Sequence, residues 1–320
     1  MNDVFRLAEI EKGLSKVDVV EIIEEGFVAY SQGKVVVPPV GEMIFESPPG
    51  DAHIKYGFIQ GDEYFVIKIA TGFYENIRLG ISTGDGLMLV FSQKTGQLVC
   101  VLLDEGYLTD VRTAAAGAVA AKHLAPSDVE RIGILGAGIQ GRLQLSYLAS
   151  VTPCKSAMVW GINAEELEAY ALETRSLGYD VRTTLEAEEI PACCNLIVTA
   201  TPSKTPLLMS DWIRPGTHIT AMGSDTHDKI ELDPQILAKA DIVVADSISQ
   251  SKSRGEIFRA TEAGTISDRD VTELGNVIQD SSLRRQNDRQ ITVADLTGVA
   301  VQDIQISKAV YESLVLQRKQ

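Results

Sequence analysis

Three glycines near the middle of the chain have the spacing of a phosphate-binding turn. The run reads Arg131-Ile-Gly-Ile-Leu-Gly-Ala-Gly-Ile-Gln-Gly141, so four strand-like residues lead into Gly136-x-Gly138-x-x-Gly141, and a helical pattern follows. Gly136 permits a tight turn, Gly138 lets a pyrophosphate approach the backbone, and Gly141 lets helix and strand pack closely. The same glycines also occur in ordinary strand–helix turns, but the order strand, glycines, helix favours dinucleotide binding at the helix N-terminus.

Two cationic side chains lie in markedly apolar or small-residue sequence. Lys68 stands within Phe65-Val-Ile-Lys-Ile69, which predicts a strand and a partly enclosed ammonium that could bind an anion. A lysine that extends from a sheet edge into solvent is the alternative. Arg112 lies one turn into an alanine-rich helix, and its guanidinium group suits a carboxylate or a phosphate. An ion pair with Asp110 or Asp104 explains Arg112 equally well.

Asp225 follows a predicted strand through Met222-Gly-Ser-Asp. In a doubly wound sheet, residues just beyond the strand C-termini line the ligand crevice, so Asp225 is a candidate acid/base beside a nicotinamide. A turn-forming aspartate is the alternative. Beside the three glycines, the candidate cofactor-binding residues in this half of the chain are Ile139, Gln140, Asn163, Thr199, Ala200, Thr201, Met222, Gly223 and Ser224.

The elements that must position these residues differ between the two halves of the chain. After residue 131, strands are predicted at 131–135, 157–160, 181–183, 195–200, 217–222 and 241–245, with helices at 139–149, 164–177 and 234–240 and near 255–263. Alternation of this length predicts an α/β fold with a doubly wound parallel (Rossmann) sheet.

The N-terminal half has a different pattern. A helix is predicted over 15–33, capped by Ser15 and ended by Gly33, followed by strands at 64–70, 86–91 and 98–103. No helical pattern separates these strands, so the sheet should be antiparallel or mixed. The alanine-rich helix 109–124 then connects the halves, and a final helix covers about 300–316.

Composition narrows the class of protein. At 320 residues, two domains are expected. A net charge of −15 disfavours nucleic acid and anionic membranes as partners. No run of about 20 apolar residues occurs, and charges interrupt the first ten residues too often for a signal peptide, so we expect a cytoplasmic protein. The four cysteines and four histidines show no metal-binding spacing, so no metal site is expected.

Four motifs in one order extend the interpretation. They are Arg112-Thr-Ala-Ala-Ala with Ala120-Ala-Lys-His-Leu-Ala-Pro126, the three glycines, Gly223-Ser-Asp-x-x-x-Lys229-x-Glu231-Leu, and Asp295-x-Thr-Gly298-x-Ala-x-Gln-Asp303. The chain thereby resembles the ornithine cyclodeaminase/mu-crystallin family over nearly its whole length. Members of that family include amino-acid cyclodeaminases, alanine dehydrogenases and reductases of imino acids, so the resemblance is specific for the family rather than for the reaction.

The resemblance implies a homodimer and roles for individual residues. Residues 1–117 with 299–320 would form an α+β substrate-binding and dimerisation domain completed by the C-terminal helix, and residues 118–298 the Rossmann domain. Lys68 and Arg112 would bind the substrate carboxylate, with Lys68 also a candidate catalytic residue. Thr113 and the 136–141 loop would hold cofactor phosphates. Asp225 would be the general acid/base, and Thr297-Gly298 would border nicotinamide and substrate.

Two departures from the family pattern bear on specificity. Many members carry an arginine near residue 40 as a further carboxylate ligand, where this chain has Gly41 within Val37-Pro-Pro-Val-Gly-Glu42. The 157–160 strand ends in Trp160-Gly-Ile-Asn163, without the acidic residue that would bind a ribose hydroxyl and without an arginine in its place. The choice between NADH and NADPH therefore stays open at this point, with NADPH at least tolerated.

The leading hypothesis is an NAD(P)H-dependent reductase of a small α-imino acid, either a Δ1-pyrroline-2-carboxylate-like ketimine or an open-chain imino acid. Hydride would add to the C=N carbon and Asp225 would protonate the nitrogen. The alternatives are an ornithine cyclodeaminase-type lyase that uses NAD catalytically, an alanine-type amino-acid dehydrogenase, and a non-catalytic small-ligand binding protein that retains NADPH.

Overall fold

The computed structural model describes residues 3–318, which form two compact units. The chain up to Thr113 and the chain from Val299 onward make the first unit, and Ala114–Gly298 make the second. Helix α3 (Tyr107–Leu124), the alanine-rich helix predicted from the sequence, contains the boundary between them.

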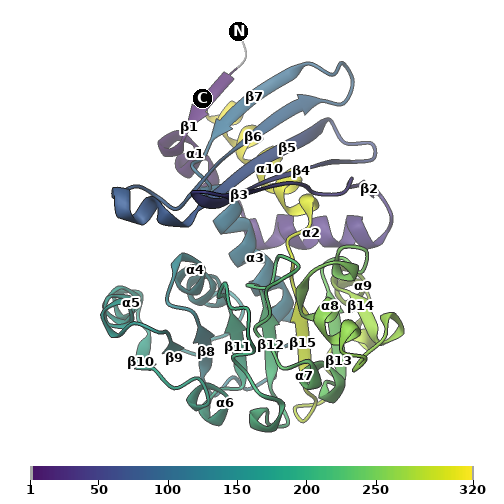
Figure 1. Cartoon of the computed structure of the whole chain (residues 1–320). Helices are drawn as coiled ribbons and strands as arrows, with labels where there is room; N and C mark the ends of the chain where they lie inside the picture. The colour runs from purple at the N-terminus through teal and green to yellow at the C-terminus, as the bar shows by residue number, and fades with distance from the viewer. Residues whose placement is uncertain (1–2, 319–320) are drawn as a thin grey trace. The chain divides into compact units, whose positions relative to one another are not determined.

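A seven-stranded sheet is the framework of the first unit (Figure 1). Its order is β1-β7-β6-β5-β4-β2, and β3 also pairs with β4. Strand β1 runs parallel to β7 and the other pairs are antiparallel, which confirms the predicted antiparallel or mixed sheet. The strands are β1 (Asp3–Arg6), β2 (Val35–Val36), β3 (Gly41–Glu46), β4 (Pro49–Ile59), β5 (Tyr64–Phe73), β6 (Gly84–Ser92) and β7 (Leu98–Leu103).

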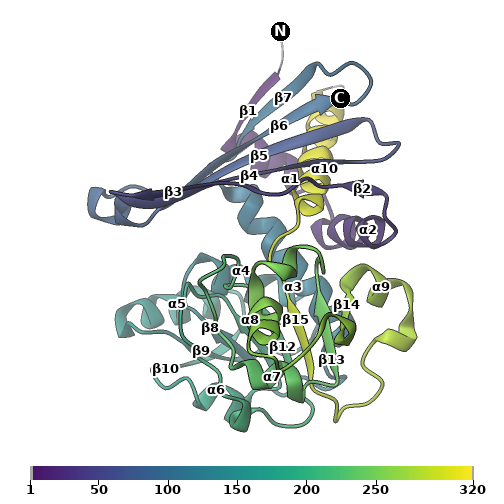
Figure 2. The ribbon, with the colours of Figure 1, turned by 45° about the vertical axis from the view of Figure 1, so that its right-hand side comes forward.

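Three helices pack in the first unit, and α10 (Ala300–Arg318) lies against the central strands β4, β5 and β6 (Figure 2). Helices α1 (Leu7–Leu14) and α2 (Val19–Ser31) pack on α10. The helix predicted over 15–33 is present as α2, but its predicted start and cap at Ser15 were wrong. Ser15 follows the end of α1, and Asp18 caps α2 by accepting the Glu21 N–H.

An eight-stranded parallel sheet is the framework of the second unit, in the order β10-β9-β8-β11-β12-β15-β13-β14. This confirms the predicted α/β class with a doubly wound sheet. The strands are β8 (Ile132–Leu135), β9 (Ser156–Trp160), β10 (Asp180–Thr184), β11 (Leu196–Thr199), β12 (His218–Ala221), β13 (Ile242–Ala245), β14 (Val271–Glu273) and β15 (Thr292–Asp295).

Helices cover both faces of this sheet. On one face the core joins Ile197 and Ile219 of the sheet to Ile190, Ile236 and Ile257 of three helices. Helix α4 packs against β8 and β11 from the other face, and α5 packs on α4 and β10. The helices are α4 (Ile139–Leu148), α5 (Ala164–Ser176), α6 (Glu189–Cys193), α7 (Pro234–Lys239), α8 (Gly255–Glu262) and α9 (Leu274–Gln279).

The order of strands in this sheet indicates where a ligand is expected to bind. The chain proceeds from β8 outward to β9 and β10, and then returns to β11 on the other side of β8. In sheets of this kind ligands bind beyond the C-terminal ends of the strands where the direction reverses. The turns after β8 and β11 are therefore the expected walls of a binding site.

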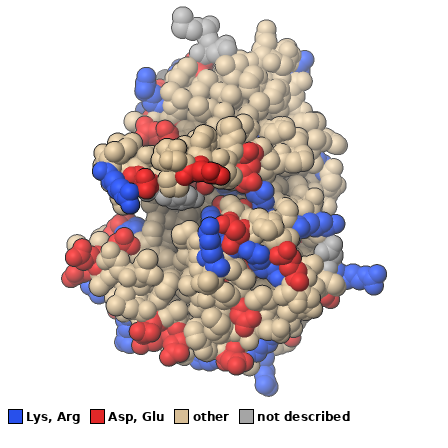
Figure 3. Space-filling view, viewed as in Figure 1, with Lys and Arg blue, Asp and Glu red and all other residues tan. Residues whose placement is uncertain are grey.

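Charged side chains of both signs occur together on the surface. On the face drawn in Figure 3, acidic and basic side chains are intermingled, in keeping with a net charge of −15 that is spread along the chain. Within residues 3–318, every helix falls short of the length or the apolar character needed to cross a bilayer.

Candidate functional site

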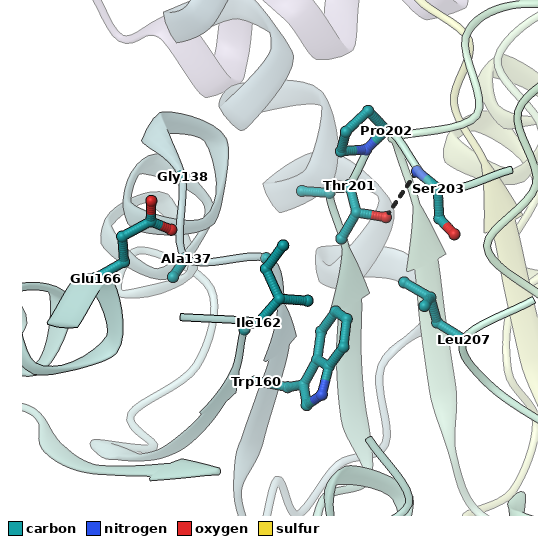
Figure 4. Close-up of a pocket in the computed structure, with 12 residues that line it drawn as sticks. Ala137, Gly138, Trp160, Ile162, Glu166, Thr201, Pro202, Ser203 and Leu207 are labelled. Carbon is teal, nitrogen blue, oxygen red and sulfur yellow. Dashed lines mark hydrogen bonds between the residues drawn. The ribbon is translucent and has the colours of Figure 1, made fainter. Parts of the chain in front are cut away.

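A cavity of about 380 Å³ opens between the turns that follow β8 and β11 (Figure 4). Gly136, Ala137 and Gly138 form one wall, and the segment from Ala200 to Ser203 forms the other. Of the predicted cofactor-binding residues, Gly136, Gly138, Ala200 and Thr201 thus lie at the cavity. Its position at the reversal point of the sheet is the place where a dinucleotide is expected.

The structure gives a different reason for glycine at each of the three positions of the motif. Gly136 has a φ of +115°, and a Cβ there would lie 2.6 Å from the Ala200 carbonyl oxygen. A Cβ on Gly141 would lie 2.0 Å from the Gly136 carbonyl oxygen, so only glycine lets α4 approach the turn. A Cβ on Gly138 would meet nothing within 4 Å. The backbone at Gly138 is therefore accessible to a ligand, as the motif predicted.

Helix α4 begins at this turn with Gly138 as its N-cap, and no side chain caps it. The Arg142 N–H bonds the Gly138 carbonyl oxygen, and the N–H groups of Ile139, Gln140 and Gly141 come before it in the first turn of the helix. Oriented N–H groups and the helix dipole favour an anionic group at such a place. The residues present therefore fit the pyrophosphate of a dinucleotide.

Several residues at the cavity were not among the predicted cofactor-binding residues, and Ile162 and Glu166 are two of them. Ile162 is 87% exposed and lines the cavity directly after β9. Glu166, from the first turns of α5, lines it too, on the same side as Ala137 and Gly138 in Figure 4. The predicted ligand Asn163 instead caps α5, because its side chain accepts the N–H groups of Glu165 and Glu166. The strand end at 160–163 contains no acidic residue, but α5 adds the Glu166 carboxylate three residues later.

A buried carboxylate joins the turns after β11 and β12. Glu231 accepts the N–H of Thr201 at 2.7 Å and of Gly223 at 2.8 Å, and also the hydroxyls of Thr199 and Thr201. A Cβ on Gly223 would lie 2.1 Å from the Thr201 carbonyl oxygen, so the two turns touch closely. The predicted cofactor residues Thr199, Thr201 and Gly223 are therefore held in one arrangement by Glu231, to which the sequence analysis gave no role.

Asp225 follows the C-terminal end of β12, and its side chain is half exposed. Lys229 donates to its carboxylate at 2.6 Å, and Arg254 donates to its carbonyl oxygen at 3.3 Å. The two predicted neighbours have other contacts: Met222 is buried at the end of β12, and the Ser224 hydroxyl donates to the Lys229 carbonyl oxygen. Asp225 is thus the residue of this turn whose side chain has both solvent access and a proton-bearing partner.

The turn Thr297-Gly298 follows β15 and is fixed from the neighbouring strand β13. Asp246 accepts the Gly298 N–H at 2.7 Å and the Thr297 hydroxyl at 3.2 Å. Gln250 adds bonds to the Thr297 hydroxyl and carbonyl oxygen. The role of Thr297-Gly298 beside nicotinamide and substrate stays a prediction, but these hydrogen bonds fix the conformation of the turn.

In the first unit, the structure places Lys68 and Arg112 in a buried cluster of charges. Lys68 is 3% exposed on β5, and Arg112 is 5% exposed on α3. The Arg112 Nε–H donates to Asp303 at 3.0 Å and its Nη1 to the Gln302 amide oxygen at 3.1 Å, both on α10. The alternative partners considered for Arg112, Asp110 and Asp104, are not the ones that bind it.

The charged groups of this cluster shift one another's pKa values. Burial raises the pKa of Asp104 to about 6, and the Lys68 ammonium opposes that rise. Burial would also raise the pKa of Asp303, but Arg112, Lys68 and Lys55 outweigh it and hold the pKa below its usual value. Lys55, which the sequence analysis did not single out, is 8% exposed and belongs to the same cluster.

Thr113, where the N-terminal segment of the first unit ends, has a hydroxyl that donates to the Thr109 carbonyl oxygen within α3. Its contact with cofactor phosphates stays a prediction. No group of three His, Cys, Asp or Glu side chains within residues 3–318 is placed to hold a metal ion.

Known proteins resemble this chain in sequence and in fold. Residues 1–318 match the model of the family described as "Ornithine cyclodeaminase/mu-crystallin family". An uncharacterized cyclodeaminase of Sinorhizobium fredii is 40% identical over 301 residues, which cover 92% of this chain and 90% of that protein. The iminosuccinate reductase of Paracoccus denitrificans is 34% identical over 297 residues, which cover 91% and 90%.

A solved structure shares the fold of the whole chain. It is an archaeal alanine dehydrogenase, a dimer with bound NAD, and it superposes with a TM-score of 0.90 at 32% identity over 99% of this chain and 97% of that one. Together these three similar proteins are named for three different reactions.

Proposed function

The chain belongs to the ornithine cyclodeaminase/mu-crystallin family, and from that premise we propose that it is a nicotinamide-dinucleotide-dependent reductase of a small α-imino acid. The observation that carries the proposal is the pairing of two features in one chain. One is a glycine turn whose backbone is open at Gly138, and the other is a buried cationic pair formed by Lys68 and Arg112.

We propose that the dinucleotide is held by the second unit. The N-terminus of α4 and the open backbone at Gly138 would take the pyrophosphate, and the cavity beside Ile162 the adenosine half. Glu166 supports a preference for NADH, since a carboxylate at the cavity can bind ribose hydroxyls and repels a 2′-phosphate. This replaces the expectation from residues 160–163 alone, and the dimer with bound NAD named above is consistent with it.

In the proposed mechanism, the nicotinamide supplies hydride to the C=N carbon when bound. Lys68 and Arg112 fix the substrate carboxylate, and such positioning removes much of the entropic barrier to reaction. Asp303 and Gln302 orient the Arg112 guanidinium by occupying its Nε–H and one Nη1–H. The Nη2 donors on the guanidinium then stay available for a carboxylate.

Asp225 is the proposed proton donor to the imine nitrogen. Its half-exposed carboxylate lies 2.6 Å from the Lys229 ammonium, which provides a proton at the site. General acid catalysis by a positioned group contributes about 10²–10⁴-fold to a rate. After the Asp225–Lys229 pair has given a proton to the substrate, solvent returns a proton to it, because the Asp225 side chain is half exposed.

A cyclodeaminase is the second candidate, because a similar protein of Sinorhizobium fredii carries that description at 40% identity. Both reactions would use the same residues, but only a reductase consumes the reduced cofactor. The purified protein should therefore be tested on a panel of imino and amino acids with NADH and NADPH, following nicotinamide absorbance and released ammonia. Stoichiometric oxidation of NADH supports the reductase. Ammonia release from a diamino acid without net cofactor change contradicts it.

A further inference from the structure

The loop 225–229, which carries the proposed proton donor Asp225, is held by one short helix. Helix α8 follows β13 after a turn of 3-10 helix (Gln250–Lys252), and Arg254 is its N-cap residue. Residues of α8 and its N-cap contact the loop at both ends and in its middle. All of these contacts lie within the second unit.

Each end of the loop accepts a hydrogen bond from an arginine. At the start, the Arg254 Nη1 donates to the Asp225 carbonyl oxygen at 3.3 Å. At the end, the Arg259 Nε–H donates to the Lys229 carbonyl oxygen at 3.4 Å, and the Ser224 hydroxyl donates to the same oxygen at 2.8 Å. Loss of the Arg259 bond would therefore leave the shorter bond from Ser224 in place.

The middle of the loop packs on the same helix. The centre of the His227 ring lies 4.8 Å from the centre of the Phe258 ring. Positions 254, 258 and 259 are separated by about one helical turn, so they lie on one side of α8. The loop therefore runs along one side of this helix, and Arg254 holds it at the residue whose side chain is the proposed donor.

The backbone beside Arg254 is fixed against the end of β15. Gly255 has a φ of +92°, and a Cβ there would collide with the Asp295 carboxylate, so this position requires glycine. The same carboxylate accepts the Ile257 N–H at 2.9 Å in the first turn of α8. The arginine thus extends toward the loop from a rigid point of the fold.

The Arg254 side chain is not what packing alone would favour at this position. Its Nε atom is buried and has no hydrogen-bond partner within residues 3–318. A buried N–H group without a partner is costly, whereas methionine, which is flexible and has no donor, would fill a similar space without that cost. The contact that the guanidinium does make is with the backbone of Asp225.

We propose that Arg254 is a positioning residue for Asp225. It holds the start of the loop so that the Asp225 carboxylate, with the Lys229 ammonium beside it, presents a proton to the substrate nitrogen. This rests on the proposed function and adds a residue to it. Arg254 acts through Asp225 rather than on the substrate or the cofactor. Displacement of a reacting group by about 1 Å can cost about 10²-fold in rate, so a residue behind the donor can matter greatly.

A double-mutant cycle tests whether the two residues act together. Arg254→Met should lower kcat by about 10- to 100-fold, which corresponds to one hydrogen bond from a charged group. The KM for the substrate and the Kd for NADH should stay within about threefold. In the Asp225→Asn background the same substitution should lower kcat by no more than about threefold, because the residue that Arg254 positions is already lost. Equal losses in the two backgrounds would overturn the proposal.

Matched variants control the cycle. Arg254→Lys keeps the charge and a donor and should recover most of the lost kcat. Arg259→Met should cost less than Arg254→Met, because Ser224 still holds the Lys229 carbonyl oxygen. Arg269→Met removes an exposed arginine of the same unit and should change neither kcat nor KM. The melting temperature of Arg254→Met should stay close to that of the wild type, because a buried unpaired N–H is lost together with the bond. If Arg254→Met does not fold, Arg254→Gln replaces it.

Amide hydrogen exchange observes the loop without turnover. A peptide covering 223–230 should exchange at least about tenfold faster in Arg254→Met, and a peptide covering 136–145 should not change. Faster exchange with an unchanged kcat would overturn the positioning role. A lower kcat with unchanged exchange would overturn it too, since Arg254 would then act directly. A wild type that releases ammonia from a diamino acid and reduces no imino acid would refute the proposed function, and the same cycle run on that reaction would still decide the role of Arg254.

Discussion

Replacing Gly138 with valine should greatly weaken dinucleotide binding while leaving the protein folded. Gly138 has a φ of −75° and a ψ of −168°, a conformation open to any residue, and its Cβ position meets nothing within 4 Å. The protein can therefore accommodate the new side chain. Valine is a weaker N-cap for α4 than glycine, which should lower the free energy of unfolding by no more than about 1 kcal/mol.

The magnitude follows from what occupies the open space. Two branched methyl groups above the turn would keep a pyrophosphate from the N–H groups that begin α4. A hydrogen bond to a charged group contributes about 1.5–3 kcal/mol, so the loss of two amounts to about 3–6 kcal/mol. Since 1.4 kcal/mol corresponds to a factor of ten, we expect the Kd for NADH to rise by about 10²–10⁴-fold.

Titration of NADH by fluorescence, combined with thermal unfolding, measures both effects. Gly141→Ala is the matched control, because its Cβ would lie 2.0 Å from the Gly136 carbonyl oxygen. That variant should lose stability, whereas Gly138→Val should lose affinity. A Kd within threefold of the wild type for Gly138→Val would show that the pyrophosphate does not bind at this turn.

Three other predictions concern proton donation, cofactor choice and stability. Asp225→Asn should lower kcat by at least about 10²-fold with an unchanged Kd for NADH, and near-normal turnover would make Asp225 a turn residue only. Glu166→Gln should shift the ratio of kcat/KM values toward NADPH by about tenfold, whereas Glu165→Gln on the same turn of α5 should not; identical ratios would remove Glu166 from the ribose site. Burial and the nearby Arg285 lower the pKa of His218 from 6.5 to about 3. The unfolded chain therefore takes up a proton below pH 6.5 that the folded chain refuses, and stability falls as the pH falls toward 3. Between pH 6.5 and 4.5 this group should contribute a loss of about 2 kcal/mol in urea unfolding, and the loss should be absent in His218→Gln. Parallel pH profiles for the two proteins would contradict this.

The parallel sheet could be predicted because each of its strands has a recognisable local sequence pattern. Each is a short apolar run, and helical patterns separate most of them, so the fold class and the glycine turn followed from neighbouring residues. The N-terminal sheet was harder. Strand β4 begins at Pro49-Gly50 and contains Gly57, residues that usually signal turns, and it was not predicted. Lys55 was missed with it, because a lysine has a direction only once its strand is known.

Hydrogen-bond and ion-pair partners that are far apart in the sequence could not be predicted from local sequence patterns. Arg112 was considered beside Asp104 and Asp110, but its carboxylate partner lies 191 residues away on α10. In the same way, Glu231 reaches back 30 residues to Thr201, and its motif gave no sign of that contact. Packing of the tertiary fold decides which charges meet, so the sequence indicates the kinds of groups in a site better than their pairing.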